Sequence, residues 1–257
     1  MTPFGLLTAA LFTSALFAQT PNIAGVWKAD IQKSKFPGPP GPQNPARLPS
    51  NYLVVITQHG EKLDEKTVVY RGNNEERSHL EFVTDGKSLV TYFHGVPTLV
   101  TASWIGNRLT LTEEVAGRNP SATKETDELS ADGQTLTIDS ATSFDGHQEQ
   151  MRLTLNKQPE SAGDPLRKPE ETAGAKFKNV KTSLKNLPTS EFIDTMHYFT
   201  FSMGQKCEFC HVAHHFDSDD KKPKHAARAM IEMVNTANTQ TFKDKQEVRS
   251  RIRFSSS

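Results

Sequence analysis

The sequence predicts two domains, an all-β antiparallel meander or barrel followed by a small, mainly α domain. Short alternating runs rich in Val, Thr, Leu and aromatic residues occupy residues 52–157. Prolines with small and charged residues occupy 158–175, a composition typical of a linker. From Lys176 onwards the pattern becomes helical and rich in methionine, and both cysteines of the chain lie there. An apolar content of 35% with 23% charged residues suits a globular protein of 257 residues.

The N-terminal residues 1–18 are expected to form a secretory signal peptide. An apolar run at 4–17 ends before the polar Gln19, and it is too short for a membrane-spanning helix. Two features depart from the pattern: no Lys or Arg precedes the run, and Leu16 lies three residues before a cleavage after Ala18. A buried N-terminal helix or a membrane anchor is the alternative. We therefore expect a periplasmic or secreted protein.

The β domain is expected at residues 22–157. It opens with a short strand at 25–28, and a proline-rich segment at 37–49 follows. The predicted strands are 52–58, 63–70, 78–84, 88–93, 98–105, 108–114, 123–129, 135–140 and 148–155. Turn dipeptides should join them as hairpins: Asp85-Gly86, His94-Gly95, Gly106-Asn107, Asp132-Gly133 and Asp145-Gly146. Consecutive antiparallel strands bury their apolar faces most simply by closing into an up-and-down barrel or a tightly curled meander.

The start of the β domain resembles the lipocalin-like domains of secreted bacterial proteins. The residues that carry this resemblance are Gly25, Trp27, Lys28, Asp30, Lys33, Ser34 and Phe36. The resemblance implies a cup for a small apolar ligand. The alternative is a filled barrel that serves as a spacer or docking module, because no chemically reactive group of residues converges in this part of the sequence.

Two amphipathic helices are predicted after the linker. The first begins at Thr189-Ser190, capped by a hydroxyl group, and ends at Gly204. One face of it carries Phe192, Met196, Phe199 and Met203. The second begins at Pro223 and runs to about residue 238, with Ala226, Met230, Met233 and Ala237 predicted to face inwards.

The segment Cys207-Glu208-Phe209-Cys210-His211 predicts covalent attachment of a haem. Two cysteines at this spacing can each form a thioether to the haem, and the adjacent histidine can then bind the iron. A zinc site that uses His214, His215 and His225 is an alternative, but structural zinc sites usually use a second cysteine pair. A redox dithiol is the other, and it would need a thioredoxin-like frame. Thioether attachment of haem takes place outside the cytoplasm, which agrees with the expected export.

The segment 176–242 resembles the cytochrome subunit of photosynthetic reaction centres and its small exported relatives. The resemblance is carried by 176–180, by the helix with Met196, by 202–204 before the cysteines, and by 227–234. It implies one haem c with His211 as the proximal iron ligand and Met196 as the distal one. Met203 is the alternative to Met196, and the remaining candidates are the histidines His197, His214 and His215.

The C-terminal end departs from that family. Relatives place a second Cys-x-x-Cys-His motif after a Glu-Val pair, whereas Glu247-Val248 is followed here by an Arg-rich stretch. We therefore expect a haem domain at 176–257 with a truncated or frame-shifted end, and we expect Met230 and Met233 to pack in its core.

An electron-transferring cytochrome c is the function that these features favour, with no catalysis. Its expected partner is a redox protein of the periplasm, and the formal net charge of zero shows no footprint for nucleic acid. The alternative is a lipocalin-like protein that binds small ligands and carries a degenerate cytochrome tail.

Overall fold

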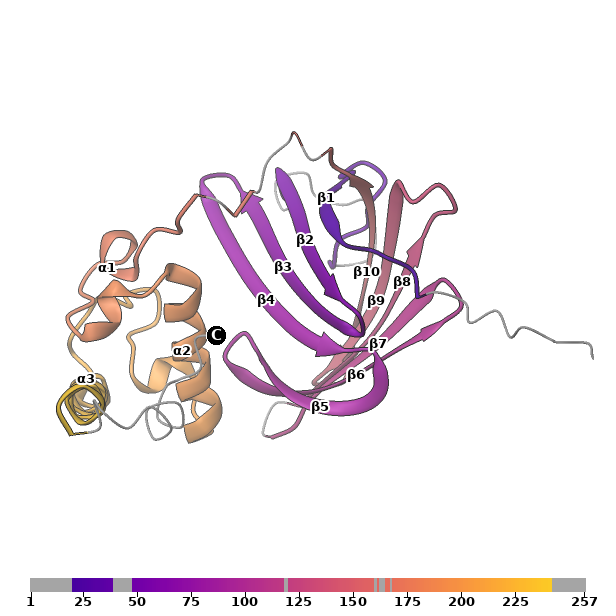
Figure 1. Cartoon of the computed structure of the whole chain (residues 1–257). Helices are drawn as coiled ribbons and strands as arrows, with labels where there is room; N and C mark the ends of the chain where they lie inside the picture. The colour runs from indigo at the N-terminus through magenta and orange to yellow at the C-terminus, as the bar shows by residue number, and fades with distance from the viewer. Residues whose placement is uncertain are drawn as a thin grey trace, which may run out of the picture.

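A ten-stranded antiparallel sheet curls into a nearly closed barrel, and a few helices follow it (Figure 1). The computed structural model describes residues 20–38, 48–117, 120–159, 161, 165–166 and 168–241. The predicted fold class is confirmed. The expected signal peptide and the doubtful C-terminal end lie outside the described residues. Within them, no helix is both long and apolar enough to cross a membrane.

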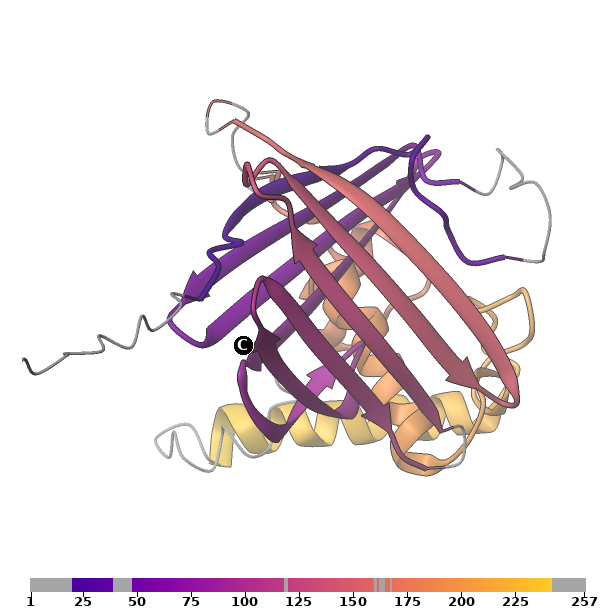
Figure 2. The ribbon, with the colours of Figure 1, turned by 90° about the vertical axis from the view of Figure 1, so that its right-hand side faces the viewer.

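The strands follow one another as an up-and-down meander (Figure 2). Their bounds are β1 Gly25–Ala29, β2 Asn51–His59, β3 Lys62–Arg71, β4 Asn74–Val83, β5 Asp85–Phe93, β6 Val96–Ile105, β7 Arg108–Val115, β8 Ser121–Leu129, β9 Thr135–Phe144 and β10 His147–Lys157. The sheet order is β4-β3-β2-β1-β10-β9-β8-β7-β6-β5, so the short β1 joins β2 to the last strand, β10. The two edges of the sheet are therefore β4 and β5, which are consecutive in the chain.

This order corrects one predicted hairpin. Asp85-Gly86 does not join two paired strands, because β4 and β5 are the unpaired edges of the sheet. Both residues instead begin β5, where the pairing with β6 shifts register between Asp85 and Ser88. The other predicted turns do join paired strands: His94-Gly95, for example, has positive φ angles of 47° and 71° between Phe93 and Val96. Asp132-Gly133 is part of a longer loop, because the pairing of β8 with β9 ends at Leu129 and Leu136.

One end of the barrel interior is filled by apolar side chains. Trp27 is fully buried there, and its indole nitrogen donates a hydrogen bond of 2.9 Å to the carbonyl of Ile23. Buried side chains from the other strands complete this core: Val54, Ile56, Leu63, Leu80, Phe82, Val100, Ala102, Leu109, Leu111, Leu136, Ile138, Leu153 and Leu155. The alternating pattern of the sequence therefore does place one face of each of these strands inwards.

Glu65 on β3 has a carboxyl group on the inward face of the sheet and is paired with the core residue Leu80. Burial, together with the charge of Glu113, raises the pKa of Glu65 to about 7. Between the unfolded pKa near 4.5 and about 7, the folded chain holds a proton that the unfolded chain has lost. The free energy of unfolding should therefore fall as the pH rises through this window.

Glu65→Gln should remove this part of the pH dependence. The difference in unfolding free energy between pH 5 and pH 8 should shrink by about 3 kcal/mol, since one pKa unit corresponds to about 1.4 kcal/mol. Urea unfolding at pH 5 and at pH 8 measures this difference in the free energy of unfolding. Glu81→Gln is the control, because Glu81 pairs with Lys62 on the outer face of the sheet. An unchanged difference in Glu65→Gln would show that Glu65 ionises normally.

The helical part contains two long helices, α2 at Thr189–Met203 and α3 at Lys222–Thr236. A short α1 at Ala173–Lys176 and 3-10 turns at Ser183–Asn186 and Cys207–Phe209 surround them, and a π-helical turn at Ala237–Thr241 extends α3. The predicted stop of α2 is confirmed, because Gly204 is left-handed with a φ of 59°.

The predicted hydroxyl cap of α2 is wrong. No side chain at the N-cap position bonds to the helix, and the Thr189 hydroxyl donates to the carbonyl of Glu171 instead. The carboxylate of Glu170 accepts two hydrogen bonds from Ser190, one of 2.7 Å from its backbone N–H and one of 2.6 Å from its hydroxyl. An acidic side chain from the segment before the helix therefore satisfies this helix start, which favours negative charge.

Helix α2 lies between the barrel and the remaining helices (Figure 1). It contacts β4 and β6, and the tip of the β5–β6 hairpin touches it. His94 in that tip lies 3.7 Å from the carboxylate of Asp194, and its ring stacks edge-on against His197 at 6.5 Å. The helix thus covers the side of the barrel near its two unpaired edges, where exposed strands would otherwise invite pairing.

Gly95→Ala should loosen this contact. A Cβ at Gly95 would lie 1.9 Å from the carbonyl oxygen of Asp194, a distance that only backbone movement can relieve. We expect faster hydrogen exchange along α2. Gly60→Ala is the matched control, because Gly60 also has a positive φ but has no atom within 4 Å of the added Cβ. It should cost only about 1 kcal/mol of backbone strain. Equal exchange of α2 in both variants would contradict the contact.

Candidate haem site

The predicted attachment motif lies on a 3-10 turn directly after α2. The turn spans Cys207–Phe209, and the backbone N–H groups of Cys210 and His211 both donate to the carbonyl of Cys207. Both thiols are free, with Cys207 exposed and Cys210 partly buried. Burial raises the pKa of the Cys210 thiol. The two sulfur atoms are therefore available for thioether formation, and a disulfide does not compete.

His211 is held with one ring nitrogen in use and the other free. Its Nδ1 lies 3.1 Å from the backbone carbonyl of Phe216. As the donor in this bond Nδ1 carries the proton, so Nε2 keeps its lone pair for a metal ion. Burial also lowers the pKa of His211, which favours the neutral ring that ligation requires. This is the second interaction that iron-binding histidines usually have.

Lys224 fixes the loop that supplies this carbonyl. Lys224 is a buried basic residue of α3. Its ammonium group donates a hydrogen bond of 2.8 Å to the carbonyl of Phe216 and one of 2.7 Å to the carbonyl of Ser218. The sequence offered no signal for this role, because one lysine in a basic first turn of a helix is ordinary. We assign it to positioning His211 through Phe216.

Asp219 ties three segments of the helical part together. Its carboxylate accepts hydrogen bonds from Asn179 and Lys181, at 2.8 Å each, and pairs with Arg228 of α3 at 2.8 Å. These donors hold its pKa well below the usual range. Arg228 also donates to the carbonyl of Asn179. The sequence analysis missed Asp219, although it singled out the stretches that contain Asn179 and Arg228.

Helix α2 has two opposite faces. Asp194 and His197 face the β5–β6 hairpin, and Phe201 reaches towards Gly117 before β8. At 100° per residue, Met196 and Met203 lie on the other side of the helix. Met196 is partly buried, whereas Met203 is 47% exposed. Of the two other candidate histidines, both exposed, His214 has a φ of 62° and His215 is in the same loop.

Large apolar side chains remain exposed around the motif. They come from the end of α2, from the motif, from the loop after it and from α3: Phe201, Met203, Phe209, Phe216, Met230 and Met233. The prediction that Met230 and Met233 pack in a core is wrong, because they are 62% and 63% exposed. The side of α3 that carries them has no covering element in the part of the chain that the structure describes.

These observations test whether the residues fit a haem. Two free thiols, an imidazole with a free Nε2 and an uncovered apolar surface next to them are the groups that a covalently held porphyrin needs. Among the described residues, no cluster of three or more His, Cys, Asp or Glu side chains could hold a metal ion alone. The zinc alternative thus lacks its ligands there, and the haem fits.

Comparison with known families agrees with this chemistry. Residues 121–248 match the family model described as "Photosynthetic reaction centre cytochrome C subunit". The C-terminal part of the chain is similar to this cytochrome family. A cytochrome C family implies haem. The match begins in β8 and so includes the last strands of the barrel, earlier than the resemblance found from residue 176.

Solved structures similar to this chain are β-barrel proteins. They include a point mutant of the fluorescent protein UnaG, at 13% identity and a TM-score of 0.36, covering 53% of this chain and 96% of that one. Secretory abundant heat soluble protein 4 from Ramazzottius varieornatus has 13% identity and a TM-score of 0.37, with 53% and 95% covered. The zebrafish ileal bile acid-binding protein complexed with cholic acid has 19% identity and a TM-score of 0.34, and the match covers 53% of this chain and 98% of that one. No curated protein matches the chain.

Proposed function

We propose that this protein is an exported, single-haem cytochrome c that transfers electrons and does not catalyse a reaction on a substrate. The observation that carries the proposal is the hydrogen bond from His211 Nδ1 to the Phe216 carbonyl, directly after two free thiols. Cys207 and Cys210 would hold the haem through thioethers. His211 Nε2 would bind the iron on one side and Met196 on the other. The bound haem would supply the one-electron chemistry.

The surrounding residues would keep small molecules from binding the iron. With both His211 and Met196 bound, the iron would have no position free for a small molecule, and methionine would raise its potential, which favours electron transfer. Lys224 and the Phe216 carbonyl would hold His211 in place. The exposed edge near Cys207 would be the side from which a periplasmic redox protein receives or donates an electron.

Reduction of the purified full-length chain under carbon monoxide tests this proposal. After export to the periplasm, a pyridine haemochrome spectrum should give one haem per chain. The reduced protein should keep its spectrum under carbon monoxide, because both axial positions are filled. A chain with haem that binds carbon monoxide readily would have an open site and would contradict electron transfer as its role. A chain without haem would favour the alternative, a lipocalin-like binding protein with a degenerate tail.

A further inference from the structure

Carboxyl groups line the barrel interior at successive depths. Glu113 on β7 is level with Thr123 on β8, and Glu125 and Asp127 follow Thr123 at alternate positions. Alternate residues of a strand face the same side, so these side chains point into the barrel together with the buried Leu109 and Leu111 opposite them. Glu65 on β3 faces the same interior, since it alternates with the core residue Leu63 and is paired with the core residue Leu80. Burial, together with the charge of Glu65, raises the pKa of both Glu125 and Asp127.

Asp127 is the deepest of these groups and lacks a partner. Its side chain is only 3% exposed, and its Oδ1 has no hydrogen-bond partner in the structure. The residues paired with it on the neighbouring strands are Leu109 and Ile138. No lysine or arginine is fully buried in the described part of the barrel. A carboxylate in such surroundings needs a positive partner or must keep its proton.

A pocket of about 340 Å³ is connected to the carboxyl groups through residues of its wall, although Glu65, Glu113, Glu125 and Asp127 do not line it themselves. Thr67 lines it, and the hydroxyl of Thr67 is 3.5 Å from the carboxylate of Glu65. Met151 lines it from β10, and its partner on β9, Ser140, is in turn paired with Glu125. The rest of the wall is mixed: its apolar side includes Phe36, Tyr52, Val69 and Phe93, and its polar side consists of Arg71, Glu76, Arg77, Ser78 and His94.

Glu65 and Glu125 keep part of their surface accessible although they face the barrel interior. The basic side chains at the pocket rim are already neutralised, because Arg71 pairs with Glu76 and Arg77 with Glu75. The carboxyl groups without a positive partner are therefore those inside the barrel.

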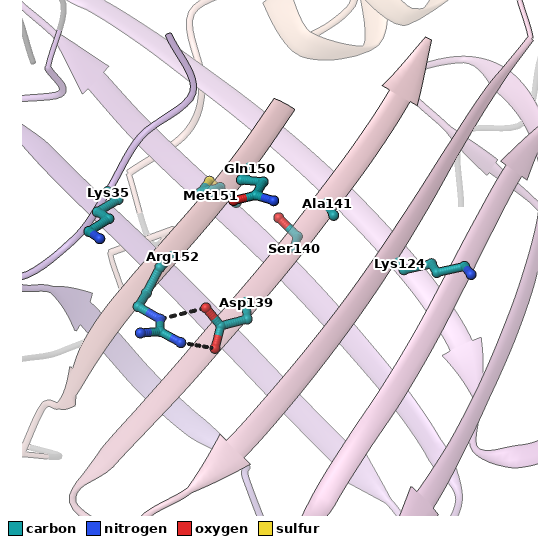
Figure 3. Close-up of a pocket in the computed structure, with 8 residues that line it drawn as sticks. All are labelled: Lys35, Lys124, Asp139, Ser140, Ala141, Gln150, Met151 and Arg152. Atoms are coloured by element: carbon teal, nitrogen blue, oxygen red, sulfur yellow. Dashed lines mark hydrogen bonds and ion pairs between the residues drawn. The ribbon is translucent and has the colours of Figure 1, made fainter. Parts of the chain in front are cut away.

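A second pocket lies on the outer face of β8, β9 and β10, and its carboxylate has a basic partner (Figure 3). Arg152 binds both carboxylate oxygens of Asp139 there, at 2.5 and 2.8 Å, and Lys35 and Lys124 add positive charge. Its acidic group is thus satisfied. It provides a matched control on the same strand, β9, that also lines the interior.

We propose that the barrel binds a small organic cation, an alkylammonium, with its charged head towards Glu125 and Asp127 and its apolar chain in the pocket above them. The apolar side of the pocket wall, with Phe36, Tyr52 and Phe93, suits the alkyl chain of such a ligand. A metal ion does not fit, since the described residues hold no cluster that could ligate one. A fatty acid does not fit either, because its carboxylate would enter beside carboxyl groups. This assignment is independent of the haem.

Calorimetric titration of the haem-loaded full chain tests it, with decylammonium chloride as the probe and decanol and decanoate as comparators. We expect decylammonium to bind at least ten times more tightly than either. The double variant Glu125→Gln, Asp127→Asn should lose that preference, whereas Asp139→Asn should bind like the wild type. Both amide substitutions remove buried charge, so folding should survive, and circular dichroism checks it. Equal binding of the three probes, no binding, or an unaffected double variant would each overturn the proposal.

Discussion

The double variant Cys207→Ala, Cys210→Ala is expected to carry no haem through a denaturing gel. Thioether bonds survive unfolding, whereas a porphyrin held only by axial ligands and apolar contacts is released. Wild-type protein exported to the periplasm should therefore show a haem-stained band at the size of the chain, and the double variant should show none. The expected effect is complete loss of staining, the largest that any substitution in this chain should give.

Glu208→Ala is the matched control for this experiment. Glu208 lies between the two cysteines on the same 3-10 turn and is exposed, so its replacement leaves both thiols and His211 unchanged. It should stain like the wild type. The double variant should keep the β-sheet signal of its circular dichroism spectrum, because the barrel core contains no cysteine. A stained band that persists in the double variant would show that attachment does not use these thiols.

The sequence predicted most of the barrel because its strands are locally specified. Alternating apolar residues and turn pairs such as Asp145-Gly146 determine each strand from within a few residues. Closure into a barrel was expected, but which two strands form the edges of the sheet is not a local property, and it was missed. That Asp85-Gly86 begins an unpaired edge strand follows from β1 joining β2 to β10, which no short stretch of sequence encodes.

The haem motif could also be predicted, but its support could not. Cys207, Cys210 and His211 are adjacent in sequence, and their spacing is itself the signal. Asp219 and Lys224 act on segments brought to them by the fold, through ion pairs and carbonyl groups that any loop could offer. The cap of α2 was missed for the same reason, because Glu170 lies outside the helix that it stabilises.

The barrel interior shows most clearly the difference between what a short stretch of sequence encodes and what only the folded chain determines. Glu125 and Asp127 alternate along β8 with polar neighbours such as Thr123, and Glu113 follows Leu109 and Leu111 on β7, so in sequence they resemble the polar positions of a solvated face. Only the direction in which each strand faces shows that they are enclosed. A charged residue at an inward position is unfavourable for folding, which makes these positions the ones most informative about function.

Met196→Ala should remove the distal ligand of the iron. Thioether ligation to ferric haem gives a weak absorption band near the red end of the visible spectrum, which histidine ligation lacks. We expect the variant to lose this band and its potential to fall on the order of 0.1 V or more, since axial ligands set haem potentials over roughly 0.8 V. The reduced variant should also bind carbon monoxide, because one axial position is open.

His197→Ala is the control, since His197 is adjacent to Met196 but faces the barrel, where its ring contacts His94. It should keep the band and the potential. Met203→Ala tests the alternative methionine, which is on the same face as Met196 but only four residues before Cys207. Met196 lies about two turns earlier in α2 than Met203, roughly 10 Å of rise further from the cysteines, which would give its side chain more room to reach the iron. Loss of the band in Met203→Ala with its retention in Met196→Ala would reverse the assignment. Absence of the band from the wild type would leave both methionines as packing residues and would count against electron transfer.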